Sequence, residues 1–293
     1  MAHIAYLSSK VTLPGSPIRR DDAFEHDRTI AALEKPFAGR GLTLEAIDWA
    51  AEDENWTRFD AAMIGTTWDY WDHQAAFLAR LDTIETQIPL FNAADLVRWN
   101  SHKGYLRSLA KQGARLIPTL WLETVTPETA AAAFDRLGSD TLVFKRQVGA
   151  GAAGQYKLNR GDALPPMPHA MMVQPFWATI QTEGELSFIF IDGGFCHALV
   201  KQAATGDYRI QSSYGGVETA ITPSPQDLCA ASDVLSALDA TPLYARVDML
   251  RGDDEALYLM ELELIEPYLY PLEGPEFGPR LAAALARRLG LAS

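Results

Sequence analysis

The chain has 293 residues, 48% of them hydrophobic, and a formal net charge of −13 at pH 7. This length allows two or three subdomains with a sizeable core, and the negative charge argues against nucleic acids and anionic membranes as partners. No apolar run approaches the roughly 20 residues of a membrane helix, and the N-terminus lacks the features of a signal peptide, so we expect a cytoplasmic protein.

Short apolar runs alternate with amphipathic stretches over residues 1–95. This order is typical of parallel strands that are joined by crossover helices, so we expect an α/β domain at the N-terminus. The expected strands are Ile4–Leu7, Leu42–Ile47, Ala61–Gly65 and Ile88–Phe91, and the expected helices are Asp22–Arg40 and His73–Leu81.

The loop after the third of these strands has the sequence Thr-Thr-Trp-Asp-Tyr-Trp over residues 66–71. Ligands of open α/β sheets bind at the carboxyl ends of the strands. Thr67, Trp68 and Asp69 are therefore candidate substrate contacts. An equally good interpretation is that the aromatic side chains pack under a neighbouring domain.

A helix is expected from Asn100 to Gln112, with Gly113 directly after its end. Asn100 or Ser101 would be the N-cap, and glycine is favoured after the last turn. Lys103 would lie in the first turn, where the helix dipole disfavours a cation by a few tenths of a kcal/mol. A bound anion would reverse that cost, although a lone lysine is more often a solvated surface residue.

The rest of the chain is expected to form hairpins with three helices. The expected strands are Trp121–Glu123, Asp140–Gln147, Ala170–Gln174, Glu185–Ile191, Phe195–Gln202, Leu243–Leu250 and Ala256–Leu264, and the expected helices are Pro127–Leu137, Pro225–Leu238 and Pro279–Leu289. Asp192-Gly193 predicts a tight hairpin turn. The two cysteines, Cys196 and Cys229, are too few for a zinc site of their own and indicate no disulfide framework.

Residues 149–154 read Gly-Ala-Gly-Ala-Ala-Gly and match the G-x-G-x-x-G pattern of dinucleotide-binding loops. In a Rossmann fold this loop opens a helix whose N-terminus carries the pyrophosphate. Here a short strand and the proline-rich segment 164–168 follow, which leaves no room for a helix. We therefore expect a loop between two strands, and an NAD-dependent oxidoreductase remains an alternative that rests on the pattern alone.

A glycine loop between strands can also hold phosphates, because its backbone N–H groups can approach the oxygens closely. Lys145 precedes Gly149 by four residues and adds positive charge beside the loop. The loop lacks the G-K-[ST] ending of a P-loop. A flexible hairpin is the commoner meaning of an isolated glycine run, but Lys145 favours a phosphate clamp.

The last expected hairpin carries acidic residues between apolar ones. Side chains alternate along a strand, so Glu261 and Glu263 share one face, and Asp248 on the partner strand can project beside them. Carboxylates among Leu, Met and Ile side chains are costly without cations. Mg²⁺ would compensate them, since it is bound by one or two carboxylates together with substrate phosphates. The alternative is a solvated acidic face, which the apolar flanks disfavour.

The order of these features resembles the ATP-grasp superfamily, and within it the glutathione synthetase and RimK-like branch. The resemblance covers nearly the whole chain; each motif is weak alone, whereas their order and the 13 residues between Asp248 and Glu261 are fairly specific. Trp-Asp-Tyr at 68–70, Trp-Asn-Ser-His-Lys at 99–103 and Glu-Leu-Glu-Leu-Ile-Glu-Pro at 261–267 resemble a bacterial subgroup that includes the O-ureidoserine cyclo-ligase of cycloserine biosynthesis.

The resemblance implies an α/β (α+β) ATP-grasp fold, in which two α+β subdomains sandwich ATP next to a Rossmann-like domain. On this basis we expect an N-terminal pre-ATP-grasp substrate domain in residues 1–98. A lid subdomain with the glycine loop would occupy residues 99–176, and a C-terminal subdomain with the metal site would occupy residues 177–293.

The resemblance also implies the contacts of the nucleotide. Two lysines would contact its phosphates, namely Lys103 and Lys145. Three glycines would form a mobile flap over them, namely Gly149, Gly151 and Gly154. The hinge between the subdomains would read the adenine edge with backbone groups, and it consists of Gln174, Pro175 and Phe176. Glu185 would bind the ribose hydroxyls.

Further roles that the resemblance implies concern the chemistry. Lys201 would lie beneath the nucleotide near the phosphates, and Arg209 would steady the transferred phosphate or the acyl phosphate. The cofactors would be ATP and Mg²⁺, for which Mn²⁺ is expected to substitute. Three carboxylates would hold the metal, namely Asp248, Glu261 and Glu263.

Three features depart from the family pattern. Glu263 stands where the family usually has Asn, and the extra negative charge requires tighter neutralisation. Ser187 stands where the glutathione synthetase branch often has a basic residue. Residues 265–271 differ from the small-residue stretch that approaches the substrate in the family. Glu266 and Tyr268 are therefore candidate substrate contacts, together with Arg209, and the identity of the substrate stays open.

Together these expectations describe an ATP-dependent carboxylate–amine ligase. A carboxylate would attack the γ-phosphoryl group to give an acyl phosphate and ADP, and a nitrogen nucleophile would then form an amide-like C–N bond. A ring results when both groups belong to one molecule. The partners would be small-molecule substrates, with no nucleic acid or membrane, and a homodimer would be ordinary for the family. The alternative is an ATP- or ADP-binding module without catalysis, against which the intact Lys145, Asp248 and Glu261 argue.

Overall fold

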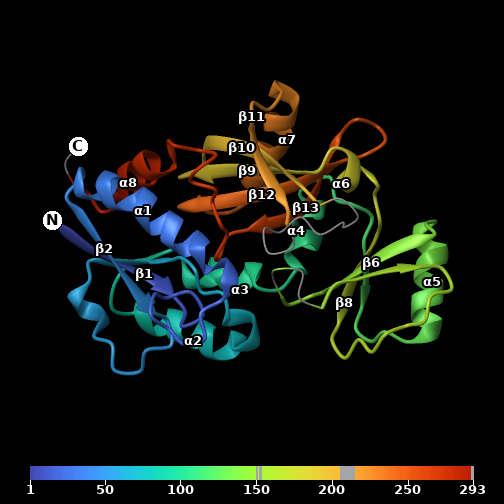
Figure 1. The fold of residues 1–293 in the computed structure, drawn as a ribbon, viewed down its shortest axis with the longest axis horizontal. Helices are drawn as coiled ribbons and strands as arrows, with labels where there is room; N and C mark the ends of the chain where they lie inside the picture. The colour runs from blue at the N-terminus through green and yellow to red at the C-terminus, as the bar shows by residue number, and fades with distance from the viewer. Residues whose placement is uncertain (150, 152–153, 205–214, 292–293) are drawn as a thin grey trace.

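The computed structural model describes residues 1–149, 151, 154–204 and 215–291. Its strands form three sheets, one towards the N-terminus, one in the middle of the molecule and one at the opposite end (Figure 1). Among these residues, no helix combines the length and the apolar character that crossing a membrane requires.

The N-terminal sheet has the strand order β2-β1-β3-β4, and its neighbouring strands run parallel. Its strands are β1 (Ala2–Ser8), β2 (Leu42–Asp48), β3 (Ala61–Ile64) and β4 (Leu90–Phe91). Its helices are α1 (Phe24–Ala38), α2 (Gln74–Glu85) and α3 (Ala94–Asn100), with the 3-10 turns η1 (Asp21–Ala23), η2 (Trp56–Arg58) and η3 (Tyr70–Asp72). The predicted strands and the first two helices are confirmed near their expected positions, because buried parallel strands appear in the sequence as continuous apolar runs.

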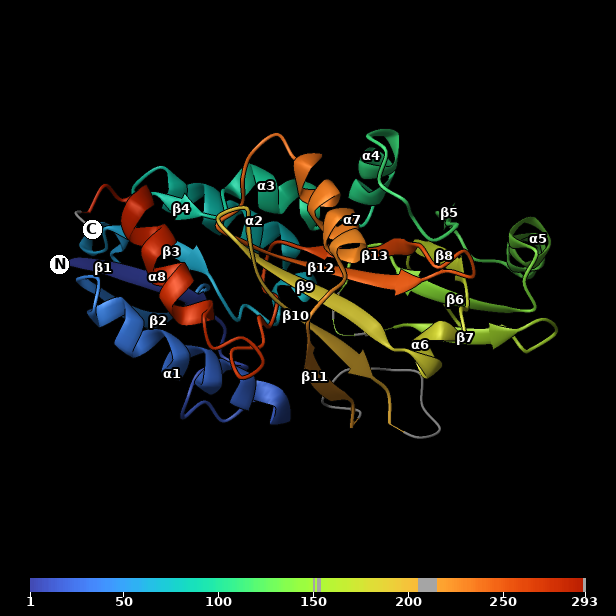
Figure 2. The ribbon, with the colours of Figure 1, turned by 90° about the horizontal axis from the view of Figure 1, so that it is seen from above.

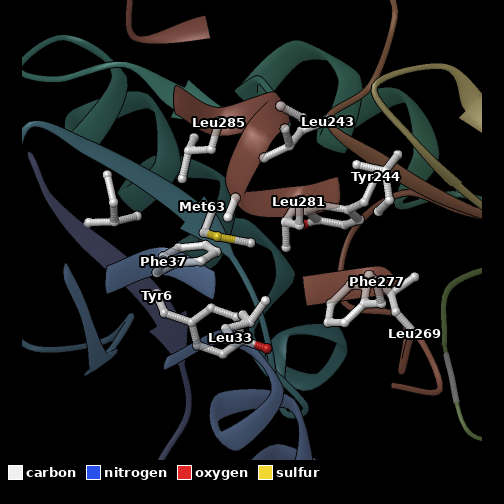
Figure 3. Close-up of a cluster of buried hydrophobic side chains, with 14 of the residues drawn as sticks. Tyr6, Leu33, Phe37, Met63, Leu243, Tyr244, Leu269, Phe277, Leu281 and Leu285 are labelled. Atoms are coloured by element: carbon white, nitrogen blue, oxygen red, sulfur yellow. The ribbon is translucent and has the colours of Figure 1, made fainter. Parts of the chain in front are cut away.

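The last helix, α8 (Phe277–Arg288), packs beside α1 and completes the core of the N-terminal sheet (Figures 1 and 2). Gly278 allows the close approach, since a Cβ there would lie 2.3 Å from the carbonyl oxygen of Ala32. The predicted terminal helix is therefore confirmed, although it begins two residues before Pro279. Figure 3 shows the shared core, which includes Tyr6, Leu33, Phe37, Met63, Tyr244, Phe277, Leu281 and Leu285.

The sheet at the far end has the order β5-β8-β6-β7, and its neighbouring strands are antiparallel. Its strands are β5 (Leu120–Leu122), β6 (Thr141–Arg146), β7 (Tyr156–Asn159) and β8 (Met171–Pro175), and its helix is α5 (Pro127–Leu137). The glycine run leads from β6 into β7, so the predicted strand–loop–strand arrangement is confirmed. The Rossmann interpretation fails here because no helix follows the loop.

The central sheet has the order β11-β10-β9-β12-β13 and is antiparallel. Its strands are β9 (Glu185–Ile191), β10 (Gly194–Gln202), β11 (Val217–Ile221), β12 (Tyr244–Arg251) and β13 (Leu257–Glu263), and the helices near it are α4 (Tyr105–Lys111), α6 (Thr179–Thr182) and α7 (Pro225–Ser236). Figure 2 shows α4 and α7 on the same side of this sheet, where they share its core. Asp192 and Gly193 have φ values of 52° and 76°, which confirms the predicted tight turn.

The predicted helix from Asn100 to Gln112 is wrong in its first part. Asn100 ends α3 and α4 begins at Tyr105, so Lys103 lies in the turn between two helices. The Asn100 side chain does not cap a helix, because it hydrogen-bonds the backbone of β13 instead. The helices α3 and α6 and the strand β11 have no counterpart among the predicted elements. The domain boundaries at residues 98 and 176 stay a prediction.

Candidate active site

A cavity of about 220 Å³ is lined by residues of the two antiparallel sheets, and by residues of the N-terminal domain that lie outside its strands. Ligand sites are usually concave and combine apolar walls with a few converging polar groups, and this cavity has that character. Most of the predicted site residues line it, namely Trp68, Lys103, Lys145, Gly149, Gly151, Gln174, Pro175, Phe176, Glu185, Lys201, Asp248, Glu261, Glu263, Glu266 and Tyr268.

Four predicted residues are not among those that line the cavity. Thr67 is fully buried, and its hydroxyl has no hydrogen-bond partner among the described residues. Asp69 accepts a hydrogen bond from Trp49 Nε1 at 2.7 Å and thus serves the packing of the N-terminal domain. Gly154 lies at the end of the glycine run, and Arg209 falls outside the described residues.

The floor of the cavity is one face of the central sheet. Asp248 on β12 is paired in register with Glu261 on β13 and with Ser187 on β9. Glu185 is paired with Lys201 on β10 in the same way. Because side chains two residues apart on a strand share a face, the expectation that Asp248, Glu261 and Glu263 lie on one face is confirmed, while their role as metal ligands stays a prediction.

Each carboxylate that was predicted to hold the metal is paired with a cation. Arg246 Nε lies 3.1 and 3.0 Å from the two oxygens of Asp248, and Lys201 Nζ lies 3.3 Å from Asp248 Oδ1. Arg246 also pairs with Glu263, and Lys103 pairs with Glu261. These ion pairs neutralise acidic groups that would otherwise be buried at high cost.

The pKa values follow from burial and from these pairs. Burial alone would raise the pKa of Asp248, but Arg246 and Lys201 outweigh it and lower the pKa to about 2. Burial dominates for Glu185 and Glu263, and it raises the pKa of each to about 7. Burial raises the pKa of Glu266 well above its ordinary value, and the nearby Glu263 adds to this effect.

Lys145 stands apart from the other cations of the floor, because it forms no ion pair with any described residue. Burial lowers the pKa of its ammonium group, and the charge of Lys103 adds to that effect. An anion in the cavity would reverse the cost, since opposite charge favours the protonated form. This half-buried lysine lies on β6, four residues before the glycine run begins.

Arg146 follows Lys145 and lies against the glycine run. Its Nε atom is buried and has no hydrogen-bond partner among the described residues. A Cβ on Gly154 would lie 2.7 Å from Arg146 Cδ, whereas a Cβ on Gly151 would meet nothing within 4 Å. Gly154 is thus required by the close contact with Arg146 as well as by its φ of 67°.

The donor set of the floor fits a hard divalent cation, because it consists of carboxylate oxygens. Over the residues that the structure describes, no three His, Cys, Asp or Glu side chains are grouped so that they could hold a metal ion alone. A cation at this floor would therefore need ligands from a second source as well. Phosphate oxygens are the usual source for Mg²⁺.

One end of the cavity is apolar and suits a flat ring. Side chains of both antiparallel sheets and of the segments beside them form its walls, namely Ile117, Val143, Pro175, Phe176, Trp177, Ile180, Leu250 and Met260. Lys157 Nζ lies 3.5 Å from the centroid of the Phe176 ring and holds that ring by a cation–π contact.

The opposite end is formed by the N-terminal domain and by the segment after β13. Trp68 Nε1 donates to the carbonyl oxygen of Glu266 at 3.1 Å and so joins these two parts. The guanidinium group of Arg20 lies 5.6 Å from the Trp68 ring centroid and 5.9 Å from that of Trp71. Arg20 also forms two hydrogen bonds to Asp22, at 2.8 and 2.6 Å.

The comparison with known proteins starts from the sequence. A family model described as "D-cycloserine synthetase DcsG, N-terminal domain" matches residues 4–92. The cycloserine biosynthesis protein DcsG of Streptomyces lavendulae is 30% identical over 274 residues, which cover 85% of this chain and 90% of that protein. The chain belongs to the DcsG family of ATP-grasp ligases.

Solved structures agree with this assignment. The crystal structure of D-cycloserine synthetase DcsG has a TM-score of 0.82 and 25% sequence identity, and the match covers 98% of this chain and 99% of that one. D-alanine–D-alanine ligase from Bacillus anthracis has a TM-score of 0.69 at 15% identity, over 99% and 97% of the two chains. A RimK domain ATP-grasp protein from Sphaerobacter thermophilus has a TM-score of 0.64 at 16% identity, over 98% and 99%. The predicted ATP-grasp fold is confirmed.

Three arginines of this DcsG-family site were not predicted, namely Arg20, Arg146 and Arg246, which all line the cavity. Arg246 could have been found, because it lies two residues before Asp248 on the same strand and therefore on the same face. Arg146 and Arg20 gave no such signal. The contact of Arg146 depends on how the glycine run folds back, and that of Arg20 depends on tryptophans 48 and 51 residues away.

Proposed function

We propose that this chain is an ATP-dependent ligase that activates a small-molecule carboxylate as an acyl phosphate and joins it to a nitrogen atom of the same molecule. The observation that carries the proposal is the floor of the cavity. There Lys145, which forms no ion pair with any described residue, lines the same cavity as carboxylates that are paired with Lys103, Lys201 and Arg246. Such a floor suits a polyphosphate with a divalent cation better than it suits a neutral ligand.

In this proposal the purine lies at the apolar end and the phosphates lie over the central sheet. Lys103 and Lys145 contact the phosphates, and Gly149, Gly151 and Gly154 cover them from above. Glu185 receives the ribose hydroxyls; one of its buried oxygens has no partner among the described residues, which supports this role. Arg209, for which the family resemblance is the only support, steadies the transferred phosphate.

The chemistry would take place in two displacements. A carboxylate oxygen of the substrate attacks the γ-phosphorus of ATP, the bond to the β–γ bridging oxygen breaks, and ADP leaves. The nitrogen then attacks the carbonyl carbon, the C–O bond to the phosphoryl group breaks, and phosphate leaves while the nitrogen loses a proton. The protein would contribute position and charge, as in other phosphoryl transfers. Mg²⁺, held by Asp248, Glu261 and Glu263, would neutralise charge on the phosphates.

We further propose that the substrate is O-ureidoserine and that the reaction closes a ring. The support for both is the identity of 30% to a protein named for cycloserine biosynthesis. Trp68, Glu266 and Tyr268, at the end of the cavity away from the purine, would contact this substrate. We place the reaction in the cytoplasm, and a homodimer stays a prediction that light scattering would check.

The experiment is an assay of ADP, phosphate and product mass, with Mg-ATP and O-ureidoserine alongside other amino acids. We expect ADP and phosphate to form together with a cyclic product. Its mass should be lower than that of O-ureidoserine by at least one molecule of water, which ring closure removes. Glu261→Gln should lower turnover at least 100-fold, because one oxygen ligand loses its charge, whereas Glu34→Gln, on the exposed face of α1, should have no effect. Full activity of Glu261→Gln would contradict the metal assignment. Binding of ADP without turnover of any substrate would favour the non-catalytic alternative.

A further inference from the structure

The side chain of Gln174 is placed where it can distinguish one purine from another. Gln174 lies in β8, next to the apolar end of the cavity, and it lines that cavity although only 2% of its surface is exposed. Its amide has one donating and one accepting end, and only one of these ends can face the cavity. Which end does so determines which purine edge is favoured.

Thr119 fixes the orientation of this amide. The Thr119 hydroxyl donates its single hydrogen to the carbonyl oxygen of Ile117, at 2.6 Å. Gln174 Nε2 lies 2.9 Å from the same hydroxyl oxygen. Because the hydroxyl has no second hydrogen, Gln174 must be the donor in this contact. Its Nε2 therefore points to Thr119, and its Oε1, which bonds to no described residue, is left as an acceptor on the cavity side.

The backbone of the hinge, residues 174–176, has few free N–H groups that could bind the edge of a base. Pro175 has no N–H group. The N–H group of Phe176 already donates to the carbonyl oxygen of Thr141, at 2.9 Å. Recognition of the base edge therefore cannot use the N–H groups of residues 175 and 176. The side chain of Gln174 is a polar group at this end whose orientation is fixed.

We infer that Gln174, positioned by Thr119, makes this site select a purine that carries an amino group at position 6 over one that carries a carbonyl there. This inference rests on the proposed function, and it names the group that sets the choice of nucleotide. The 6-amino group of adenine donates to Gln174 Oε1. The 6-carbonyl of hypoxanthine or guanine would face that oxygen with another acceptor, and a buried acceptor without a donor is penalised.

The test compares the binding of ADP and inosine diphosphate by calorimetry, in the presence of Mg²⁺. The two nucleotides differ at the base edge, where adenine has an amino group at position 6 and hypoxanthine has a carbonyl. We expect the wild-type chain to bind ADP at least tenfold more tightly. Thr119→Val has a similar shape but no hydroxyl, so it frees the amide to turn over, and it should reduce the preference about tenfold. Thr119→Ser keeps the hydroxyl and should keep the preference.

A second variant separates selectivity from folding. Gln174→Met removes the amide at similar volume, and it should bring the two affinities close to each other. In this background Thr119→Val should cause no further change in the ratio, because Thr119 acts only through Gln174. Thermal unfolding shows whether the variants are folded, and the ratio of the two affinities does not depend on the amount of folded protein.

Failure of the proposed function can be distinguished from failure of the inference about Gln174. If the wild-type chain binds neither nucleotide, the proposed function fails and the inference fails with it. If ADP binds but the wild-type chain binds inosine diphosphate equally well, or if Thr119→Val and Gln174→Met both keep the full preference, the inference is overturned while the proposed function stands.

Discussion

The side-chain amide of Asn100 donates to the carbonyl oxygen of Leu262 at 2.9 Å, and its oxygen accepts from the N–H group of Leu264 at 3.1 Å. Leu262 lies in β13, which is an edge strand of the central sheet, between Glu261 and Glu263. Asn100 thus gives this edge, which has no further strand beside it, the pair of hydrogen bonds that a neighbouring strand would give. The Tyr105 hydroxyl adds a third bond at the same edge, since it accepts from the N–H group of Leu262 at 2.8 Å.

Removal of this amide should weaken both the fold and the metal site. Asn100→Ala leaves a buried carbonyl and a buried N–H group without partners, so we expect a loss of about 2 kcal/mol in the free energy of unfolding, measured with urea. The affinity for Mn²⁺ with ADP should also fall, because the strand that carries Glu261 and Glu263 loses its outer support. Tyr105→Phe removes one acceptor and should cost about half as much. An unchanged unfolding curve for Asn100→Ala would contradict this role.

The glycine run gives a second prediction through the contrast between Gly151 and Gly154. Both have positive φ, so alanine at either position costs about 1 kcal/mol of backbone strain. Gly154→Ala should cost roughly another 1 kcal/mol, because its Cβ would lie 2.7 Å from Arg146 Cδ. In an Arg146→Ala background the two substitutions should destabilise equally, which urea unfolding of the four variants would check.

The same loop is predicted to close over the phosphates. Valine at the positive φ of Gly151 strains the backbone and lowers stability. The Gly151→Val protein that remains folded should in addition have a raised KM for ATP, since its backbone would no longer approach the phosphates freely. An unchanged KM would show that Gly151 takes no part in nucleotide binding.

Trp68 gives a third prediction, for the substrate end. Trp68→Phe removes the hydrogen bond to the Glu266 carbonyl oxygen, so the segment after β13 should be held less firmly against the N-terminal domain. We expect the KM for the carboxylate substrate to rise several-fold while the affinity for ADP stays the same. Trp56→Phe is the matched control, because the Trp56 ring is buried in the same domain and its Nε1 has no partner among the described residues. Equal effects of both variants would exclude a specific role of Trp68.

His26 gives a fourth prediction, for the dependence of stability on pH. The ring is buried, and its Nδ1 lies 2.6 Å from Thr66 Oγ1. Burial lowers the pKa from 6.5 to about 4. The unfolded chain therefore takes up a proton at higher pH than the folded chain does, so stability falls as the pH drops below 6.5 and stops falling near pH 4.

Between pH 7 and pH 5 this one residue should cost about 2 kcal/mol. His26→Gln should make the stability measured with urea depend less on pH over that range, whereas His169→Gln, with its exposed ring, should not. The pKa of His197 is also lowered to about 4 by burial, so part of the dependence should persist in His26→Gln. If the stability of His26→Gln depended on pH as strongly as that of the wild-type chain, His26 would not be a cause of the pH dependence.

Much of the fold could be predicted because local patterns reflect local structure. The period of two along β13 was enough to place Glu261 and Glu263 on one face, and the length of the hairpin brought Asp248 opposite Glu261. The prolines after the glycine run were enough to exclude a helix there. In these cases the residues that interact are close in the sequence or lie on paired strands.

The parts that failed depend on contacts between distant segments. Asn100 is of a residue type that often caps helices. Its amide hydrogen-bonds instead to the backbone of β13, 162 residues later in the chain. Thr67 and Asp69 were candidate substrate contacts because they follow a strand. The structure buries Thr67 and joins Asp69 to Trp49 by a hydrogen bond, and their contact with a substrate stays a prediction. The role of Thr119 depends on the pairing of β5 with β8, which no local pattern predicts.

The packing of α8 on α1 has a consequence for how the chain is made. Leu33 and Phe37 of α1 belong to the same core cluster as Phe277 and Leu281 of α8, which the ribosome adds almost at the end of synthesis. At the usual speed of elongation, α8 is synthesised on the order of ten seconds or more after the strands of the N-terminal sheet. During that time their apolar face is open to chaperones and to other nascent chains, so the first domain to be synthesised is among the last to be completed.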